Sequence, residues 1–378
     1  MNSDWIRIGL LYVVGVIAAS QLGKMSALVP LIDRELTLGL TVAALLVSLL
    51  EIGGASLGVV AGMLLHRIGE RRSVLLGLGC FVAAGIGAAF AHDVAMLLAW
   101  RVLEAAGYLA VVIAAPPLIS RTAGPARRGV ALALWSSFVP VGLALGAMLA
   151  GAAADLSSWR VASFGGGVIA AIALLALLLL LGDVHPDEAS MRARARPNAR
   201  TWLLAAGFGA YTLFEVGLLA LLPSFLVEQT GASPSLAGLG TGIASLATLG
   251  GALVAAWHNH RPRDATWMLT VSLLLPAALL FAVFRDHPDY LSVVIAAIVL
   301  NAVSGILPGL AFAMQPRVAG DNMAIANGLF TQFGAGGSLL GPPVMAACVG
   351  AGGWIGAAIC GAVFSAISLA LLLRVGRD

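Results

Sequence analysis

Long apolar segments dominate this sequence and restrict what it can fold into. Windows of about 19 residues separate twelve of them. Each is close to the roughly 20 residues that a helix needs to cross the hydrocarbon core of a bilayer. The segments span residues 6–32, 40–65, 73–91, 94–119, 128–153, 160–182, 201–227, 234–257, 267–285, 289–314, 322–349 and 351–374. The sequence therefore predicts an all-α polytopic membrane protein with twelve transmembrane helices.

The composition agrees, because 60% of the 378 residues are hydrophobic and 10% are charged, whereas soluble domains carry about 25% charged residues. The first segment is longer than the apolar region of a signal peptide and no small-residue cleavage site follows it, so we expect a retained helix. The cysteines lie within apolar segments, and His258 and His260 fall in a predicted loop. Their spacing does not suit metal ligands, so no metal and no cofactor are expected.

The arginines predict the orientation of the chain. Sixteen of them fall at segment ends or loops on one side of the predicted topology, and Arg34, Arg160 and Arg285 fall on the other. Because loops rich in arginine stay in the cytoplasm and the number of crossings is even, both termini are expected to be cytoplasmic, in a bacterial inner membrane. The arginines are dispersed among short loops, which does not favour nucleic-acid binding.

Two similar halves are indicated by repeated sequence. "ALVPLIDRELT" at 27–37 matches "ALLPSFLVEQT" at 220–230 with a shift of 193 residues, and "WSSFVPVGLALGAM" at 135–148 matches "FTQFGAGGSLLGPP" at 330–343 with a shift of 195. Two matches at nearly the same shift indicate a parallel repeat of six helices. The predicted parts are an N-terminal half over 1–182, a cytoplasmic linker over 183–200 and a C-terminal half over 201–378.

The loop between the second and third segments carries a motif. Residues 62–76 read "GMLLHRIGERRSVLL", and the fourth segment contains "WRVLEAAGYLA". Both stretches resemble motifs of the major facilitator superfamily of membrane transporters, and the finer resemblance is to bacterial permeases akin to cyanate transporters. The loop matches that family at Gly62, Leu64, Arg67, Gly69, Arg71 and Arg72, and departs from it at His66 and Glu70.

This resemblance implies the major facilitator fold, with two parallel pseudo-symmetric six-helix halves that rock about a central site, as a monomer in the lipid bilayer. It also implies that the loop at 62–76 braces the closed cytoplasmic side. The family usually has aspartate where this chain has His66. A neutral imidazole could replace it and make the gate pH-sensitive, or Glu70 could supply the carboxylate instead. The sequence leaves both interpretations open.

Polar residues inside the apolar segments are the candidate functional residues. A charge at the bilayer centre costs at least about 2.5 to 3.5 kcal/mol, so such residues are expected to face a cavity or a partner. In the resembling family, the first, fourth, seventh and tenth helices line the central cavity. The substrate-contact candidates are Gln21, Lys24, Arg101, Tyr108, Tyr211, Asn301 and Gln332, and the proton-coupling candidates are Glu51, Glu104 and Glu215.

Some of these residues allow a second interpretation. Arg101 and Glu104 are three residues apart on one helix face, so they could satisfy each other instead of contacting substrate. Glu51 could pair with a charge such as Lys24 or stay protonated at an interface. Lys24 is the only lysine in the chain, and it could extend toward the membrane surface. Its place near the middle of its segment would leave that extension incomplete, so Lys24 is the leading candidate for contact with a substrate anion.

The pattern favours a secondary transporter of a small hydrophilic solute, either an organic anion or a zwitterion, because Lys24 and Arg101 are the cations expected at the cavity. Proton coupling is expected from the carboxylates inside the segments. The alternatives are a proton-driven exporter of amphipathic compounds and, from another class, a membrane-embedded enzyme or a sensor. The sequence contains no HExxH motif, so no enzyme is expected.

Overall fold

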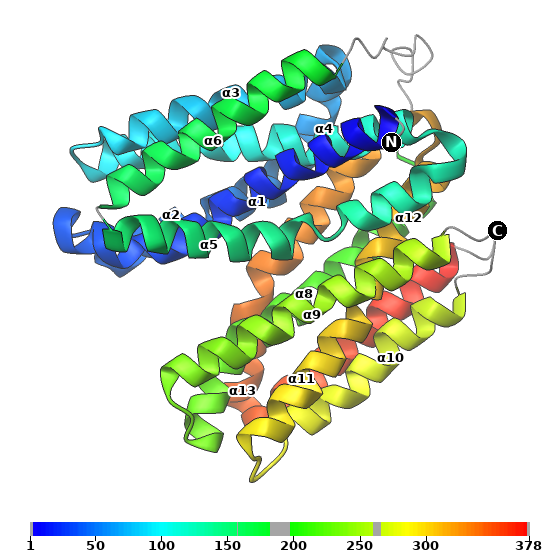
Figure 1. Ribbon diagram of the computed structural model, residues 1–378. Coiled ribbons are helices and arrows are strands. Elements are labelled where there is room, and N and C mark those ends of the chain that lie inside the picture. Colours follow the sequence, from blue (N-terminus) through cyan, green and yellow to red (C-terminus); the bar gives the residue numbers. More distant parts are fainter. Residues whose placement is uncertain (1–2, 157, 182–196, 260–265, 376–378) are drawn as a thin grey trace. The chain divides into compact units, whose positions relative to one another are not determined.

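The computed structural model describes residues 3–156, 158–181, 197–259 and 266–375. Within these ranges every regular element is a helix, as the apolar segments predict. The helices are α1 (Ser3–Leu36), α2 (Gly39–Ile68), α3 (Glu70–Ala89), α4 (Val94–Trp135), α5 (Phe138–Leu156), α6 (Trp159–Leu180), α8 (Ala199–Thr230), α9 (Pro234–Asn259), α10 (Thr266–Val283), α11 (Tyr290–Ser304), α12 (Ile306–Ala319) and α13 (Met323–Val375), shown in Figure 1.

Ten helical stretches in the described ranges are long and apolar enough to cross a membrane. Two of them, Val94–Ala153 with 60 residues and Met323–Val375 with 53 residues, are much longer than the roughly 20 residues of one crossing. Each is interrupted by a glycine with a positive φ, which is 66° at Gly124 and 66° at Gly353. Gly124 lies between two predicted segments and Gly353 lies just inside the start of the last one, so the long stretches each accommodate two of the twelve.

Two predicted segments contain a break that the sequence analysis did not anticipate. The segment at 128–153 is divided at Ser136 and Ser137, whose hydroxyls donate to the carbonyls of Ala133 and Leu134 at 2.7 and 2.8 Å. Such bonds compete with helical backbone bonds. The segment at 289–314 is divided between α11 and α12, where the chain passes through Gly305.

Contacts between Cα atoms divide the chain into two units. Unit 1 contains Met1–Arg128, Phe138–Ala195 and Asp321–Gly328, and unit 2 contains Gly129–Ser137, Arg196–Gly320 and Leu329–Asp378. In unit 1, α1 packs along α5 and α3 packs along α6, whereas in unit 2 α11 packs on both α9 and α10. The domain boundaries predicted from the sequence stay a prediction, and most of the predicted linker lies at residues 182–196, outside the described part of the chain.

The contact between α1 and α5 in unit 1 depends on glycine. A Cβ atom on Gly23 would lie 2.0 Å from the carbonyl oxygen of Leu143, and one on Gly146 would lie 2.2 Å from that of Ser20. The two backbones therefore touch directly, as small residues allow in membrane helices. Gly23 directly precedes Lys24 in α1, so this contact fixes where Lys24 lies in unit 1.

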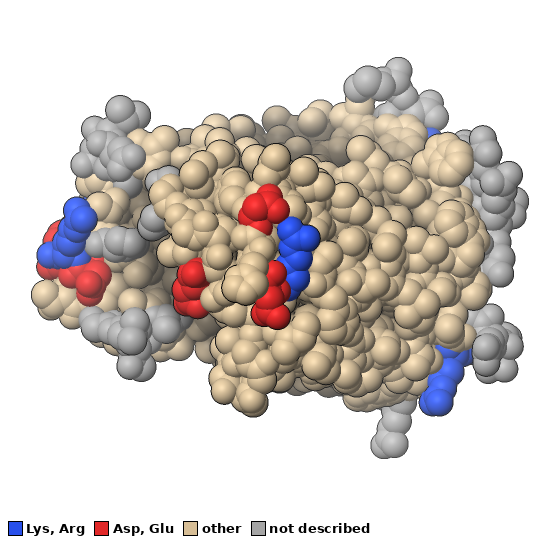
Figure 2. Space-filling model, turned by 90° about the horizontal axis from the view of Figure 1, so that it is seen from below, with Lys and Arg blue, Asp and Glu red and all other residues tan. Residues whose placement is uncertain are grey.

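The surface of the described residues is largely apolar. Figure 2 shows one face on which uncharged residues cover most of the surface and charged side chains gather in small groups. Large apolar side chains are widely exposed, for example Met148 at 69% and Leu179 at 74%. Extended apolar surface of this kind is unfavourable in water and suits contact with lipid tails.

Candidate functional site

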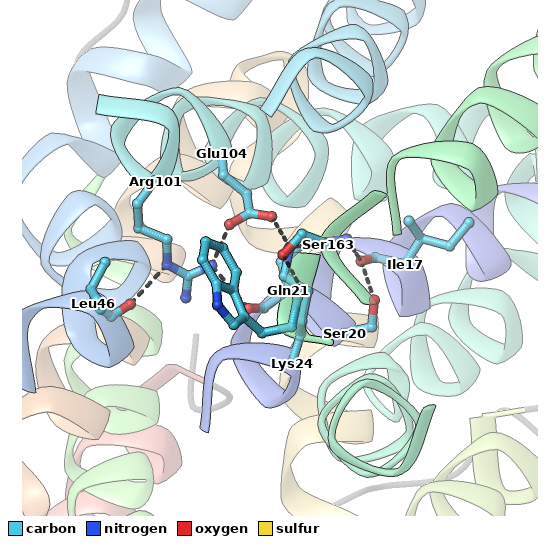
Figure 3. Close-up of polar contacts among 9 residues, drawn as sticks. Ile17, Ser20, Gln21, Lys24, Leu46, Arg101, Glu104 and Ser163 are labelled. Carbon is cyan, nitrogen blue, oxygen red and sulfur yellow. Dashed lines mark hydrogen bonds and ion pairs between the residues drawn. The ribbon is translucent and has the colours of Figure 1, made fainter. Parts of the chain in front are cut away.

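Four of the predicted polar residues meet inside unit 1, where α1 and α4 face each other. Gln21 and Lys24 come from α1, and Arg101 and Glu104 come from α4, so each helix contributes two residues on one face, three positions apart. All four are buried, and Arg101 is only 1% exposed. Figure 3 shows Glu104 between the two cations. We call these four residues the charged cluster.

Hydrogen bonds fix the geometry of the charged cluster. The Lys24 Nζ donates to Glu104 Oε1 and, at 2.6 Å, to Gln21 Oε1. The Arg101 Nη1 donates to Glu104 Oε2 and, at 3.0 Å, to the carbonyl oxygen of Gln21. The Arg101 Nε donates to the carbonyl oxygen of Leu46 on α2 at 2.8 Å. Three helices therefore hold the guanidinium in one orientation.

The charged cluster contains more positive than negative charge. Two cations share one carboxylate, which leaves one formal positive charge without a counter-charge when all three groups are ionised. The Arg101 Nη2 is also buried and has no hydrogen-bond partner among the residues that the structure describes. A buried charge and a buried unpaired donor are both costly. An anionic group that accepts hydrogen bonds would satisfy both at once.

The structure describes the pairing of two groups whose partners the sequence left open. Arg101 and Glu104 do form an ion pair, but Glu104 also pairs with Lys24, so the two α4 residues are not a closed pair. Lys24 is bound to Glu104 and not to Glu51. Glu51, on α2, instead lies near Tyr108 of α4, which is itself buried.

A second group of buried polar residues lies in unit 2. Glu215 and Tyr211 on α8 lie beside Ser304, at the end of α11. Both carboxylate oxygens of Glu215 are buried and have no hydrogen-bond partner of normal geometry among the described residues. Asn301 is fully buried and donates to the carbonyl oxygen of Ala297 at 2.8 Å, while its side-chain oxygen has no partner within the described ranges. The last predicted contact in this unit, Gln332, lies half-buried on α13.

An aromatic cluster in the same unit was not predicted from the sequence. Phe208 stacks on Phe330 with ring centroids 4.0 Å apart and an interplanar angle of 15°. Phe312 packs edge-on against both rings, and Tyr211 extends the cluster from the next turn of α8. Phenylalanines within apolar helices give no sequence signal that separates such a cluster from ordinary core packing.

The loop at 62–76 forms polar contacts within unit 1. Glu70 pairs with Arg121 at 2.8 Å, and the Arg71 Nε donates to the carbonyl oxygen of Leu181 at 3.2 Å. Gly69 has a φ of 89°, which only glycine adopts easily. The loop positions Arg67 and Arg72 are exposed, and Gly62 is buried against α13.

The side chain of His66 lies outside the described part of the structure, so the proposed pH-sensitive gate stays a prediction. The pairing of Glu70 with Arg121 supports the alternative in which Glu70 supplies the carboxylate of this loop.

Similarity to known proteins extends over nearly the whole chain. A family model described as Major Facilitator Superfamily matches residues 11–214 and 203–378. The 3-(3-hydroxy-phenyl)propionate transporter of Escherichia coli strain K12 is 29% identical over 332 residues, which cover 83% of this chain and 80% of that protein. The arabinose-proton symporter of the same strain is 27% identical over 52% of this chain and 38% of that protein. The solved structure of the transporter FucP in its outward conformation has a TM-score of 0.79 and 19% identity, with 100% of both chains covered.

Proposed function

Because the chain belongs to the major facilitator superfamily, we propose that it is a proton-coupled secondary transporter of a small organic anion, with both termini in the cytoplasm of a bacterium. The chain is a multi-span membrane protein of transporter type, and its relatives are transporters and not enzymes. The family resemblance supports transport by alternating access, in which a solute site opens first to one side of the membrane and then to the other.

The observation that carries the choice of an anion is the charge of the charged cluster. Lys24 and Arg101 share the single carboxylate of Glu104, and Arg101 keeps one buried donor that has no partner in the described part of the chain. A solute carboxylate would supply the missing negative charge and acceptor oxygens. Lys24 suits reversible binding, because an ammonium group is a single point charge, whereas the planar guanidinium of Arg101 is held by backbone carbonyls.

Aromatic carboxylates are the first solutes to test. The E. coli relative is named for 3-(3-hydroxy-phenyl)propionate, a molecule with one ring and one carboxylate.

Glu215 is the leading candidate for proton coupling. Its carboxylate is buried and has no ion pair among the described residues, and a carboxyl group in such surroundings is stable when protonated. Glu104 is already bound by two cations, which favour its charged form. The arabinose relative is named as a proton symporter, which supports coupling to protons. Glu51 remains a further candidate for the same role.

The proposal is tested by uptake into proteoliposomes with an imposed proton gradient. We expect 3-phenylpropionate or a related aromatic carboxylate to accumulate when the outside is acidic, and to stop accumulating when the gradient is collapsed. The matched control is Arg285→Met, which removes an exposed cation of unit 2 that pairs with Asp289. Lys24→Met should abolish uptake while Arg285→Met retains it.

The runner-up is a proton-driven exporter of amphipathic compounds. The surplus positive charge of the charged cluster disfavours cationic drugs. Acidification-driven release of a cationic dye from loaded proteoliposomes, without any uptake of organic anions, would favour that alternative.

A further inference from the structure

Two consecutive prolines interrupt the hydrogen bonding of α4. Pro116 and Pro117 lie inside the helix, and proline has no backbone N–H to donate to the carbonyl four residues earlier. The carbonyls left without a helical donor are those of Val112 and Ile113. Both residues are buried, with Ile113 at 0% exposure, where an unpaired carbonyl is unfavourable.

The side chain of Asn327, on α13, supplies both missing donors. Its Nδ2 donates to the carbonyl oxygen of Val112 at 3.0 Å and to that of Ile113 at 2.9 Å. A carboxamide nitrogen carries two hydrogens, so one group replaces the two donors that the prolines lack. The opposite orientation of the amide would place its oxygen against two carbonyl oxygens, which fixes the assignment of the nitrogen.

The stretch of α13 around Asn327 rests on α2 through glycine contacts. A Cβ atom on Gly328 would lie 2.4 Å from the carbonyl oxygen of Gly58, and one on Gly62 would lie 2.8 Å from that of Ala324. These surfaces approach closely without interlocking side chains. Among the contacts that the structure describes, the two hydrogen bonds of Asn327 are therefore the polar interactions that keep this stretch of α13 in place.

Residues 323–328, which we call the latch segment, belong to unit 1, whereas α13 continues from Leu329 as part of unit 2. We propose that the latch segment detaches reversibly from α2 and α4 while the protein stays folded, and that Asn327 controls this equilibrium by binding the carbonyls freed by Pro116 and Pro117. Water can replace the amide at both carbonyls when the segment leaves. The use of this movement in a transport cycle rests on the proposed function.

The test is the rate at which a maleimide labels a cysteine at Ala324, a residue of the latch segment that is 6% exposed. The Ala324→Cys reporter is introduced after Cys80, Cys348 and Cys360 have been replaced by alanine, and the whole protein is labelled in proteoliposomes. Asn327→Ala should raise the labelling rate about tenfold or more, because two buried hydrogen bonds are lost. Asn327→Leu, which has similar volume and no donor, should give the same increase.

Two controls separate a latch from a general loss of stability. Asn322→Ala changes a neighbouring asparagine whose side-chain oxygen has no hydrogen-bond partner among the described residues, and it should leave the rate unchanged. A second reporter, Ala150→Cys on α5, is 5% exposed and should label no faster when Asn327 is replaced. Equal acceleration at both reporters would show global loosening and would overturn the proposal.

Replacement of the two prolines of α4 tests directly whether Asn327 acts by binding the carbonyls that they leave free. Pro116→Ala combined with Pro117→Ala restores two backbone donors, so Asn327→Ala should then raise the labelling rate by no more than about twofold. An equal increase with and without the prolines would overturn the proposal, as would no increase in either background. The labelling requires no transported solute, so a failure of the proposed transport function would leave this comparison decisive.

Discussion

Removal of Glu104 should destabilise the protein far more than removal of Lys24. Glu104 is the one carboxylate of the charged cluster, and it accepts a hydrogen bond from each of two buried cations. Glu104→Gln leaves Lys24 and Arg101 facing each other without a negative charge. Breaking a buried pair by removing one partner costs about 3–5 kcal/mol, and we expect a loss of unfolding free energy in this range.

Lys24→Met has a different consequence in the same place. The variant loses one charge-assisted bond to Glu104, but it also removes the surplus buried charge and leaves the pair of Arg101 with Glu104 intact. These two effects oppose each other, so we expect the free energy of unfolding to change by about 1 kcal/mol or less.

The assay is reversible unfolding of the purified protein in mixed micelles, followed by circular dichroism. Arg285→Met serves as the matched control, since it removes a cation from an exposed ion pair, and such pairs contribute little to stability. If Lys24→Met destabilises the protein as much as Glu104→Gln does, Lys24 is a structural partner of Glu104, and the inference of a surplus charge that awaits a solute is refuted.

Three further outcomes follow from the structure. Glu215→Gln should abolish proton-driven accumulation of solute but retain exchange of labelled for unlabelled solute, since the variant resembles a permanently protonated carboxyl group; loss of both activities would contradict the proton role. Gly146→Val should lower the unfolding free energy by about 1–3 kcal/mol, because a Cβ atom there would lie 2.2 Å from the carbonyl oxygen of Ser20; an unchanged midpoint of thermal unfolding would contradict direct backbone contact. Arg160, at 2.5 Å, and Trp159 donate hydrogen bonds to Glu35 and hold the pKa of its carboxyl below the ordinary value. The stabilisation that these hydrogen bonds give the folded protein is therefore present at neutral pH and is lost as the pH falls through that lowered pKa. Glu35→Gln should remove this part of the pH dependence of unfolding, and an identical pH profile in the variant would contradict it.

The helical architecture was largely predictable, because each crossing needs about 20 apolar residues and such runs are visible without tertiary information. The breaks within the predicted segments were less predictable. Ser136 and Ser137 end a helix through hydroxyl bonds to nearby carbonyls, yet serine is also tolerated within membrane helices. Gly305 lies at a close approach to the carbonyl oxygen of Thr248, which depends on a neighbouring helix and has no local sequence signal.

The charged cluster was predictable in part. Spacing of three residues placed Gln21 with Lys24 on one helix face and Arg101 with Glu104 on another. The bond that joins the two pairs links residues 80 positions apart, whereas the sequence had suggested Glu51, and not Glu104, as a possible partner for Lys24. Only the packing of α1 against α4 distinguishes the two carboxylates.

The contact of Asn327 with α4 had a signal in the sequence from which it could have been predicted. It is a polar residue within an apolar segment, and nothing in that segment identifies its partner. Pro116 and Pro117 leave two carbonyls of α4 without donors, and a buried carboxamide has two hydrogens to give. Consecutive prolines within a membrane helix can therefore be used to predict a contact with a buried asparagine elsewhere in the chain.

The central claim is that a proton-coupled organic-anion transporter uses Lys24 to neutralise its solute. The most direct measurement is proton entry into proteoliposomes upon addition of each member of a panel of organic anions, beginning with 3-phenylpropionate. We expect at least one anion to drive proton entry with the wild type and with Arg285→Met, and none to do so with Lys24→Met. Proton entry that persists in Lys24→Met, or the absence of any response across the panel with the wild type, would contradict the claim.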